Sequence, residues 1–168
     1  MAFNLTLLLC DNMLVSSTTL AAEIFNFAQA MARTSKQPVQ DVVIRRVTPD
    51  GQPVQTSAGF ELQATHSLAD SFDSDLIHIP ALWRNPRPAV KKYQAYIPWL
   101  REHHQRNCSF TAVGTGVCFL AEAGLLDGKP ATTCPLDTSD AADELLRVDL
   151  GGCRNIKKKN ITISTHTY

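Results

Sequence analysis

Continuous runs of apolar residues alternate with amphipathic stretches along most of this chain. The longest runs lack the polar alternation of a half-exposed strand, which is typical of strands buried on both faces of a parallel sheet. These runs lie at residues 5–10, 41–47, 75–80 and 109–113. Shorter strands are predicted near 53–56 and 60–64, joined through Gly59, and at 131–134.

The stretch after the first strand has helical periodicity. Ser16 and Ser17 are candidate N-caps for a helix that runs to about Arg33. The large apolar side chains of this stretch recur at three- and four-residue spacing, at Leu20, Ile24, Phe27 and Met31. This spacing places them on one face of the helix, and we expect that face to be buried.

A second helical stretch opens at Pro86 and Pro88. Its apolar face carries Val90, Tyr93, Ile97 and Leu100. Because proline lacks an N–H group and its ring clashes with the preceding turn, Pro98 predicts either a kink or two helices placed end to end.

Strands that alternate with helices imply βαβ crossovers. We therefore expect an α/β fold with a mainly parallel sheet and helices on both of its faces. In such sheets ligands bind at the carboxyl ends of the strands. The expected binding region is formed by the loops that follow Cys10, Pro80, Val113 and Thr133.

The composition fits one globular domain without an unusual charge. The chain has 168 residues, of which 44% are apolar and 19% charged, and its sixteen basic and sixteen acidic residues cancel. Total charge therefore gives no case for nucleic acid or a membrane. Five cysteines without a C-x-x-C pair argue against a zinc site or a disulfide framework. We expect a cytoplasmic protein with reduced thiols, no metal or other cofactor, and no membrane segment.

The segment from Ser109 to Thr133 predicts a strand, a sharp elbow at Gly114-Thr115-Gly116, a helix that ends near Ala123, and a further strand. An elbow of this kind lifts one residue above the sheet edge, where the N–H groups of the following helix stabilise an anion. A nucleophile at that point gains a lowered pKa and an oxyanion site.

The same segment resembles the ThiJ/PfpI domain of AraC-type transcription regulators. The matching residues are Thr115-Gly116, the run from Ala121 to Gly128 (AEAGLLDG) and Ala131-Thr132-Thr133. The resemblance implies a flavodoxin-like three-layer sandwich of the class I glutamine amidotransferase type, and weaker similarity extends back to residue 5. It also implies a sensor domain that binds a small metabolite or forms a homodimer.

The sequence departs from the family pattern at the positions that carry its chemistry. Gly114 stands at the nucleophile's position, Cys134 replaces a histidine, and Ala81-Leu82 replaces Gly-Gly. The first-loop acidic residue corresponds to Ser17. We therefore expect a non-catalytic pseudoenzyme. Its predicted ligand pocket comprises Gly114, Thr115, Ser17, Ala81, Leu82 and Cys134.

Two other functions stay open. One is a cysteine-dependent hydrolase or glyoxalase-like enzyme of the ThiJ/PfpI type that uses Cys118 or Cys134, and the other is a non-functional truncated remnant. The resemblance ends at Cys134, which predicts a family domain at 1–134, incomplete at its C-terminus, and a divergent polar tail at 135–168. No helix-turn-helix is recognisable, so we expect no sequence-specific DNA binding by this chain alone.

The remaining candidate residues have plain structural interpretations. Cys10 and Cys118 are expected to be buried, and His103-His104 to be a solvated helix end rather than a metal site. Trp83 lies in a predicted pocket loop, where it covers a ligand, packs on the second helix or lies at a dimer contact.

Overall fold

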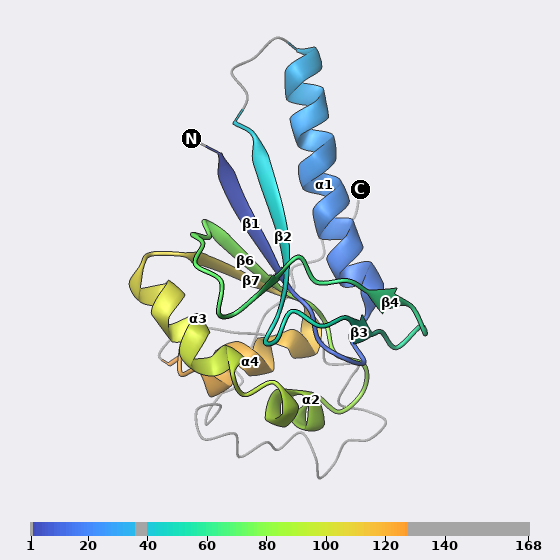
Figure 1. Cartoon of the computed structure of the whole chain (residues 1–168), viewed down its shortest axis with the longest axis vertical. Coiled ribbons are helices and arrows are strands. Elements are labelled where there is room, and N and C mark those ends of the chain that lie inside the picture. Colours follow the sequence, from blue (N-terminus) through green and yellow to red (C-terminus); the bar gives the residue numbers. More distant parts are fainter. Residues whose placement is uncertain (1, 36–39, 128–168) are drawn as a thin grey trace, which may run out of the picture.

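The computed structural model describes residues 2–35 and 40–127 of the chain (Figure 1). The predicted strand at 131–134, Cys134 and the tail at 135–168 lie outside these ranges. The domain boundary at residue 134 therefore stays a prediction.

A five-stranded sheet forms the centre of the fold, and every pair of neighbouring strands in it is parallel. The order across the sheet is β5 (His66–Ser67), β2 (Val42–Thr48), β1 (Phe3–Leu8), β6 (Leu76–Ile79) and β7 (Ser109–Ala112). The four longer strands coincide with the apolar runs, which confirms the predicted parallel α/β sheet. The two-residue strand β5 has no apolar run and was not predicted.

The strand order reverses direction between β1 and β6. From β1 the chain crosses over to β2 on one side, whereas the β6 to β7 connection moves to the other side. In parallel sheets the loops at such a reversal separate and leave a crevice at the carboxyl ends of the two strands. The loops that follow β1 and β6 therefore mark the expected binding region.

A small antiparallel hairpin lies outside the main sheet. It pairs β3 (Val54–Gln55) with β4 (Glu61–Leu62), and Gly59 in the connecting turn has a φ of 80°. Its backbone bonds to the loop after β1, since the Asn12 N–H donates to the Gln55 carbonyl at 2.8 Å. The hairpin confirms the predicted strand pair.

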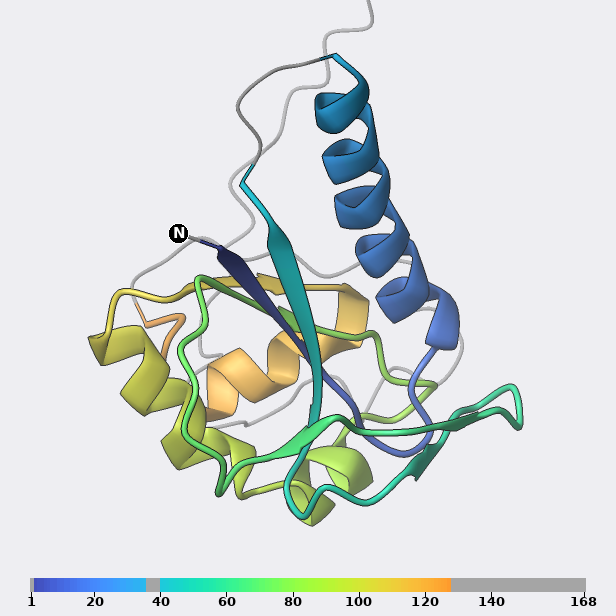
Figure 2. The same ribbon diagram turned by 45° about the horizontal axis from the view of Figure 1, so that its top comes forward.

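Helices lie on both faces of the sheet (Figures 1 and 2). The helix α1 (Val15–Thr34) stands on one face, and α2 (Arg87–Lys92), α3 (Tyr96–Gln105) and α4 (Val117–Glu122) gather on the other. The main core lies on the second face, where Tyr96 contacts Phe119 edge to face at 5.8 Å. The Tyr96 hydroxyl also donates to the carbonyls of Leu9 and Val47, at 2.6 and 3.0 Å.

Pro98 lies inside the first turn of α3. Of the two predicted outcomes, a kink or two helices end to end, the chain shows two successive helices. The break falls at residues 93–95, before the proline. A first-turn N–H has no partner within the helix, so proline costs little there. The predicted apolar face is confirmed by four buried residues: Val90, Tyr93, Ile97 and Leu100.

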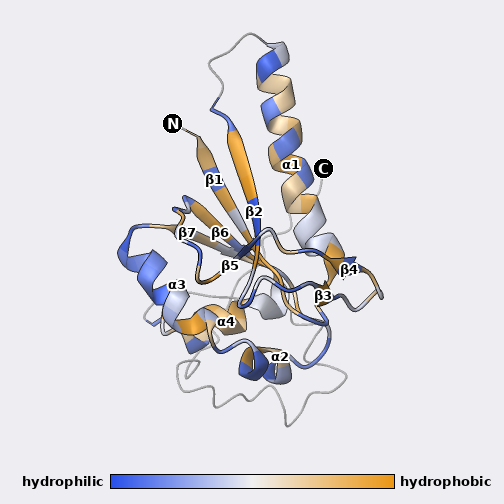
Figure 3. Ribbon diagram, in the orientation of Figure 1, coloured by the Kyte–Doolittle hydropathy of each residue, from blue (hydrophilic) through white to orange (hydrophobic). Residues whose placement is uncertain are grey.

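The helix α1 differs from its prediction in two ways. It begins at Val15 without a side-chain cap, and the Ser17 hydroxyl donates back to the Leu14 carbonyl at 2.6 Å. The expected burial of its large apolar stripe is wrong. These side chains are between 50% and 67% exposed: Leu20, Ile24, Phe27 and Met31. The opposite side of the helix faces the sheet, where Thr18 is buried and Phe25 stacks on Phe3 of β1, and polar and apolar residues are interleaved along the helix (Figure 3).

Candidate functional site

The elbow after β7 is the first component of the site. Val113 leaves the strand with its N–H bonded to the Ile79 carbonyl at 3.1 Å, and Gly114 turns the chain with a φ of 49°. At Gly116 the chain runs so close to β6 that an added Cβ atom would lie 2.2 Å from the Pro80 carbonyl oxygen. Glycine is therefore required there because of the close backbone approach, and the elbow is fixed against the end of β6.

The structure brings five of the six predicted pocket residues together. The Ala81 N–H donates to the Ser17 hydroxyl at 3.1 Å, and the Leu82 N–H donates to the Thr115 hydroxyl at 2.9 Å. A Cβ atom at Gly114 would lie 3.8 Å from that of Ala81, so the elbow apex adjoins the same loop. The sixth residue, Cys134, lies outside the range that the structure describes.

These hydrogen bonds close the cluster rather than leave it open to a ligand. The Thr115 hydroxyl also donates to the Leu82 carbonyl at 2.8 Å, and Ser17 already donates to Leu14. Two adjacent backbone N–H groups, at Ala81 and Leu82, are therefore occupied by side-chain oxygens of this chain. Backbone N–H pairs of this kind stabilise oxyanions only when they are free to face the reacting atom.

Two of the thiols in the described residues, Cys10 and Cys108, are not activated. Burial, together with the negative charge of Asp11, raises the pKa of Cys10 to about 12. Burial also raises the pKa of Cys108 to about 11. Since the thiolate is the reactive form, neither group is a nucleophile near neutral pH. Cys10 is fully buried, as expected. Cys118 lies one turn beyond the elbow and packs half-buried against the core, so its expected burial is confirmed in part.

An open cleft of about 250 Å³ lies beside the closed cluster, where the strand order reverses. Its walls come from the loop after β1, the loop after β6, and α2. The lining residues are Asp11, Asn12, Leu82, Trp83, Asn85, Pro88, Ala89, Lys92 and Tyr93. Leu82 belongs to both the cluster and the cleft, so the predicted pocket lies against one wall of the open space.

Asp11 is the charged centre of this cleft. Its carboxylate accepts hydrogen bonds from Lys92 and from the Gln55 N–H, the latter at 2.9 Å. Partial burial favours a higher pKa for Asp11, but these hydrogen bonds outweigh it and hold the pKa below its ordinary value. The cleft therefore presents a carboxylate and an ammonium side by side. Trp83 forms its rim with 46% of its surface exposed.

The sequence prediction missed Asp11, Lys92 and Tyr93. The sequence could have identified Asp11 as a site residue, because it follows directly after the first buried strand, at the carboxyl end where ligands bind. Lys92 and Tyr93 lie some eighty residues further on, on a helix whose placement over this loop depends on the tertiary fold. The Asp11 N–H donates to the Tyr93 hydroxyl at 2.9 Å, which fixes α2 against the loop.

His78 connects β6 to α1 next to the cluster. Its Nε2 lies 2.9 Å from the Ser17 carbonyl oxygen and its Nδ1 2.9 Å from the Thr111 hydroxyl. Because a carbonyl oxygen only accepts, Nε2 carries the proton and Nδ1 accepts from Thr111. Burial lowers the pKa of His78, while the bond to Ser17 acts in the opposite direction.

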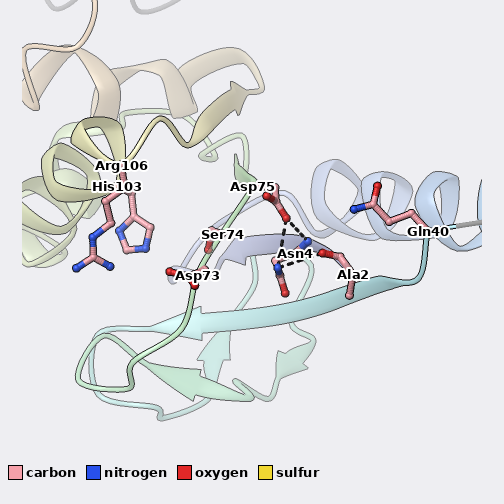
Figure 4. Close-up of a pocket in the computed structure, with 8 residues that line it drawn as sticks. All are labelled: Ala2, Asn4, Gln40, Asp73, Ser74, Asp75, His103 and Arg106. Carbon is pink, nitrogen blue, oxygen red and sulfur yellow. Dashed lines mark hydrogen bonds between the residues drawn. The ribbon is translucent and has the colours of Figure 1, made fainter.

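A second, larger hollow of about 480 Å³ lies at the other end of β1 and β6 (Figure 4). It is lined by Asp73, Asp75, His103 and Arg106, among others. The prediction of a solvated His103 is wrong: the side chain is buried, its ring centroid lies 3.8 Å from that of Trp99, and its Nε2 atom is not accessible to solvent. That nitrogen therefore offers nothing to a ligand, and this end of a parallel sheet is not where ligands bind.

Within residues 2–35 and 40–127, no three His, Cys, Asp or Glu side chains come together as metal ligands would. None of the helices placed there is both long and apolar enough to cross a bilayer.

Comparison with known proteins points to one family. The model of the DJ-1/PfpI family matches residues 12–152. The HTH-type transcriptional regulator CdhR of Pseudomonas aeruginosa is 35% identical over 86 residues, which cover 51% of this chain and 25% of that protein.

Solved structures agree with this assignment. A protein of Vibrio parahaemolyticus proposed to be a transcriptional regulator has a TM-score of 0.64 and 26% identity over 75% of this chain and 63% of that one. An AraC family regulator of Pseudomonas putida has a TM-score of 0.65 at 22% identity over 80% and 68% of the two chains, which supports the fold alone. The chain thus matches a quarter of the curated relative and less than two thirds of the Vibrio structure.

Proposed function

Because this chain belongs to the DJ-1/PfpI family, we propose that it is a cytoplasmic sensor domain of the kind found in AraC-type regulators. It binds a small metabolite without converting it, and it forms a homodimer. Its relatives of known description support this proposal, since CdhR and the Vibrio protein are both described as transcriptional regulators. The membership agrees with the resemblance read from residues 109–133.

The proposal that the domain is non-catalytic rests on the chemistry of the elbow. Gly114 offers no side chain at the apex, and Ser17 and Thr115 occupy the adjacent N–H groups of Ala81 and Leu82. Covalent catalysis at an elbow needs both a nucleophile and free donors for the oxyanion that it creates. The apex lacks the nucleophile, and the two donors beside it at Ala81 and Leu82 are occupied, which favours a binding role over an enzymatic one.

The metabolite binds in the cleft where the strand order reverses, against the predicted pocket wall at Leu82. The pairing of Asp11 with Lys92 suits a small molecule that carries both an amino and an acidic group, since each charge finds its opposite. Trp83 at the rim provides an apolar surface that covers the bound molecule.

Two tryptophans allow a direct test. Trp83 lies on the cleft rim, whereas Trp99 is buried at 8% exposure and does not line the cleft. We expect a panel of amino acids, monocarboxylates and primary amines to contain a compound that changes the fluorescence. The change should disappear in Trp83→Phe and persist in Trp99→Phe. A response that follows Trp99 would place the ligand elsewhere.

A charge variant with a matched control tests the polar contacts. We expect Lys92→Met to weaken binding of the responding compound about tenfold, because a charged hydrogen bond contributes about 1.5–3 kcal/mol. Lys91→Met is the control, since the neighbouring Lys91 is exposed and does not line the cleft. Equal affinities of the two variants would contradict this site.

The chain by itself does not bind a specific DNA operator in this proposal. Its acidic and basic residues balance, so the total charge gives no case for a DNA-binding surface, and the chain matches only 25% of the regulator CdhR. A mobility shift with excess competitor DNA checks this, and sequence-specific retention of the 168-residue chain would refute it.

A further inference from the structure

Asp11 and Lys92 form an ion pair inside the cleft at the strand-order reversal, and the structure holds the two side chains very differently. The Lys92 side chain is 65% exposed, whereas that of Asp11 is 34% exposed. Both line the open space. In the free protein each therefore occupies the charge that a ligand with an amino and an acidic group has to meet.

The position of Asp11 is fixed from several sides. Its carboxylate accepts from the Gln55 N–H of β3 at 2.9 Å, and its own N–H donates to the Tyr93 hydroxyl at 2.9 Å. The next residue, Asn12, donates its N–H to the Gln55 carbonyl at 2.8 Å and accepts from the Trp83 N–H at 3.0 Å. Asp11 therefore cannot move without breaking bonds to the hairpin, to the end of α2 and to the loop after β6.

The Lys92 ammonium is free to move away from this carboxylate. Among the described residues the Asp11 carboxylate is its one hydrogen-bond partner, and the lysine stem is long and flexible. An exposed ion pair of this kind changes an equilibrium by no more than about fivefold. Of the two partners, Lys92 is thus the one that gives way when a ligand arrives.

A second resting place for Lys92 lies beside the first. Its Nζ atom lies 5.4 Å from the centroid of the Tyr93 ring, within reach of a cation–π contact. That ring is fixed, because it stacks on the buried ring of Tyr96 with centroids 5.7 Å apart. The ammonium can therefore leave Asp11 and still remain above the aromatic floor of the cleft.

We propose that Lys92 is an internal competitor of the ligand and that it sets the specificity of the cleft. The amino group of the ligand takes the place of the Lys92 ammonium at the Asp11 carboxylate. Lys92 then turns to the acidic group of the same ligand while it stays above Tyr93. The inference rests on the proposed function, since it concerns the same cleft, and it adds how that cleft rejects other compounds.

The exchange explains why a ligand needs both charges. A compound with both groups replaces one ion pair by two. An amine alone has to displace Lys92 and gives that ammonium no new partner. An acid alone has to draw Lys92 away and leaves the mostly buried Asp11 carboxylate without a cation, which is costly. The ion pair therefore discriminates against singly charged compounds.

The ion pair is not required to hold α2 in place. Val90 and Tyr93 are both buried at 6% exposure, and the Tyr93 hydroxyl attaches the end of the helix to the loop after β1. We therefore expect Lys92→Met to change the melting temperature by no more than about 2 °C. An altered ligand preference in this variant then reports on the exchange and not on the stability of the fold.

Three probes with one carbon skeleton test the proposal. Leucine carries both charges, isopentylamine has lost the carboxylate, and 4-methylpentanoate has lost the amino group. Each is titrated into the full chain, into Lys92→Met and into Asp11→Asn at constant ionic strength, with Trp83 fluorescence as the signal. The wild type should bind leucine more tightly than either singly charged probe.

The two variants should change affinity in opposite directions for different probes. Lys92→Met should weaken leucine about tenfold, because the acidic group loses its partner, but strengthen isopentylamine about two- to fivefold, because the competitor is gone. Asp11→Asn should weaken leucine at least tenfold and strengthen 4-methylpentanoate about two- to fivefold, because Lys92 is released. Simple damage to the cleft would weaken every probe.

Two matched controls remove the same charges elsewhere. Lys91→Met and Asp73→Asn alter exposed residues that do not line this cleft, and they should leave all three affinities unchanged. The asparagine at position 11 keeps an oxygen that can accept from the Gln55 N–H, so the hairpin stays attached. Circular dichroism checks that each variant is folded.

The outcomes separate this inference from the proposed function. If Lys92→Met weakens leucine and isopentylamine alike, Lys92 is an ordinary contact and the inference fails, while the binding role stands. Wild-type affinity for isopentylamine equal to that for leucine would also overturn it. Binding of single-charge probes to the variants, with no probe bound by the wild type, would support the competitor but count against the proposed binding role. Absence of binding to every chain would overturn the inference, because a vacated Asp11 or Lys92 would then attract no counter-charge.

Discussion

Replacement of Gly116 by alanine tests the close contact between the elbow and β6. The added Cβ atom would lie 2.2 Å from the Pro80 carbonyl oxygen and 3.2 Å from the Ile79 carbonyl oxygen. Both obstacles are backbone atoms and cannot rotate away. An ordinary contact begins near 3.4 Å, so the elbow must retreat from β6 by about 1 Å.

The cost follows from what this retreat disrupts. Overpacking of a closely packed site costs about 1–3 kcal/mol. The displacement also stretches the bonds from Val113 to Ile79 and from Leu82 to Thr115, each of which contributes about 1 kcal/mol. We expect Gly116→Ala to lower the free energy of unfolding by about 3–5 kcal/mol, an unusually large loss for one methyl group.

Two other glycines separate this steric effect from backbone strain. Gly116 has an ordinary helical φ of −59°, whereas Gly114 and Gly59 have φ values of 49° and 80°. At Gly114 the nearest atom to a new Cβ is 3.8 Å away, and at Gly59 none lies within 4 Å. Alanine at either position should cost only the left-handed strain of about 1–2 kcal/mol.

Urea denaturation followed by circular dichroism provides the measurement. The expected order of destabilisation is Gly116→Ala first, with Gly114→Ala and Gly59→Ala similar to each other and smaller. If Gly116→Ala were no more destabilised than Gly114→Ala, the elbow would not be held against β6 as described, and the argument for a closed cluster at this site would fail with it.

Three further predictions concern ionisable and reactive groups. Because burial lowers the pKa of His78 below its ordinary 6.5, the unfolded chain binds its proton more readily. The contribution of His78 to the free energy of unfolding should thus be fully present above pH 6.5 and be lost as the pH falls below that value. The urea midpoint of His78→Gln should therefore depend less on pH than that of the wild type. Cys10 and Cys108, with pKa values raised to about 12 and 11, should react with iodoacetamide at pH 8 only after unfolding; rapid labelling of either in the native protein would contradict their burial. Gly114→Cys should add one alkylatable thiol but no ester or glyoxal turnover; measurable turnover would show that the neighbouring N–H groups are free after all.

The sequence predicted the sheet and the elbow because each depends on local signals. Buried parallel strands have uninterrupted apolar runs, and a Gly-Thr-Gly turn between a strand and a helix has few other interpretations. The loops after Cys10, Pro80 and Val113 were expected to meet because the carboxyl ends of parallel strands share one edge, and the family resemblance supplied the residues Ser17, Ala81 and Thr115 within this region. Their mutual hydrogen bonds could not be predicted, because side-chain direction is set by the fold.

The errors also have physical causes. The stripe of α1 was assigned to the core because helical periodicity shows which residues share a face, but not whether that face meets the same chain or another one. The inner face mixes Thr18 and other polar residues with Phe25, so it gave a weaker apolar signal than the stripe with Leu20 and Phe27. His103 was placed in solvent on its residue type, and its stacking on Trp99 depends on where α3 lies.

The occupied amides at Ala81 and Leu82 bear on how such a domain evolves. A single mutation that restored a thiol at the elbow would still find both donors bonded to hydroxyl groups. Release of those donors would require Ser17 and Thr115 to change as well, and neither change brings an advantage until the thiol is present. A cysteine-dependent activity is therefore hard to gain at this elbow by stepwise mutation.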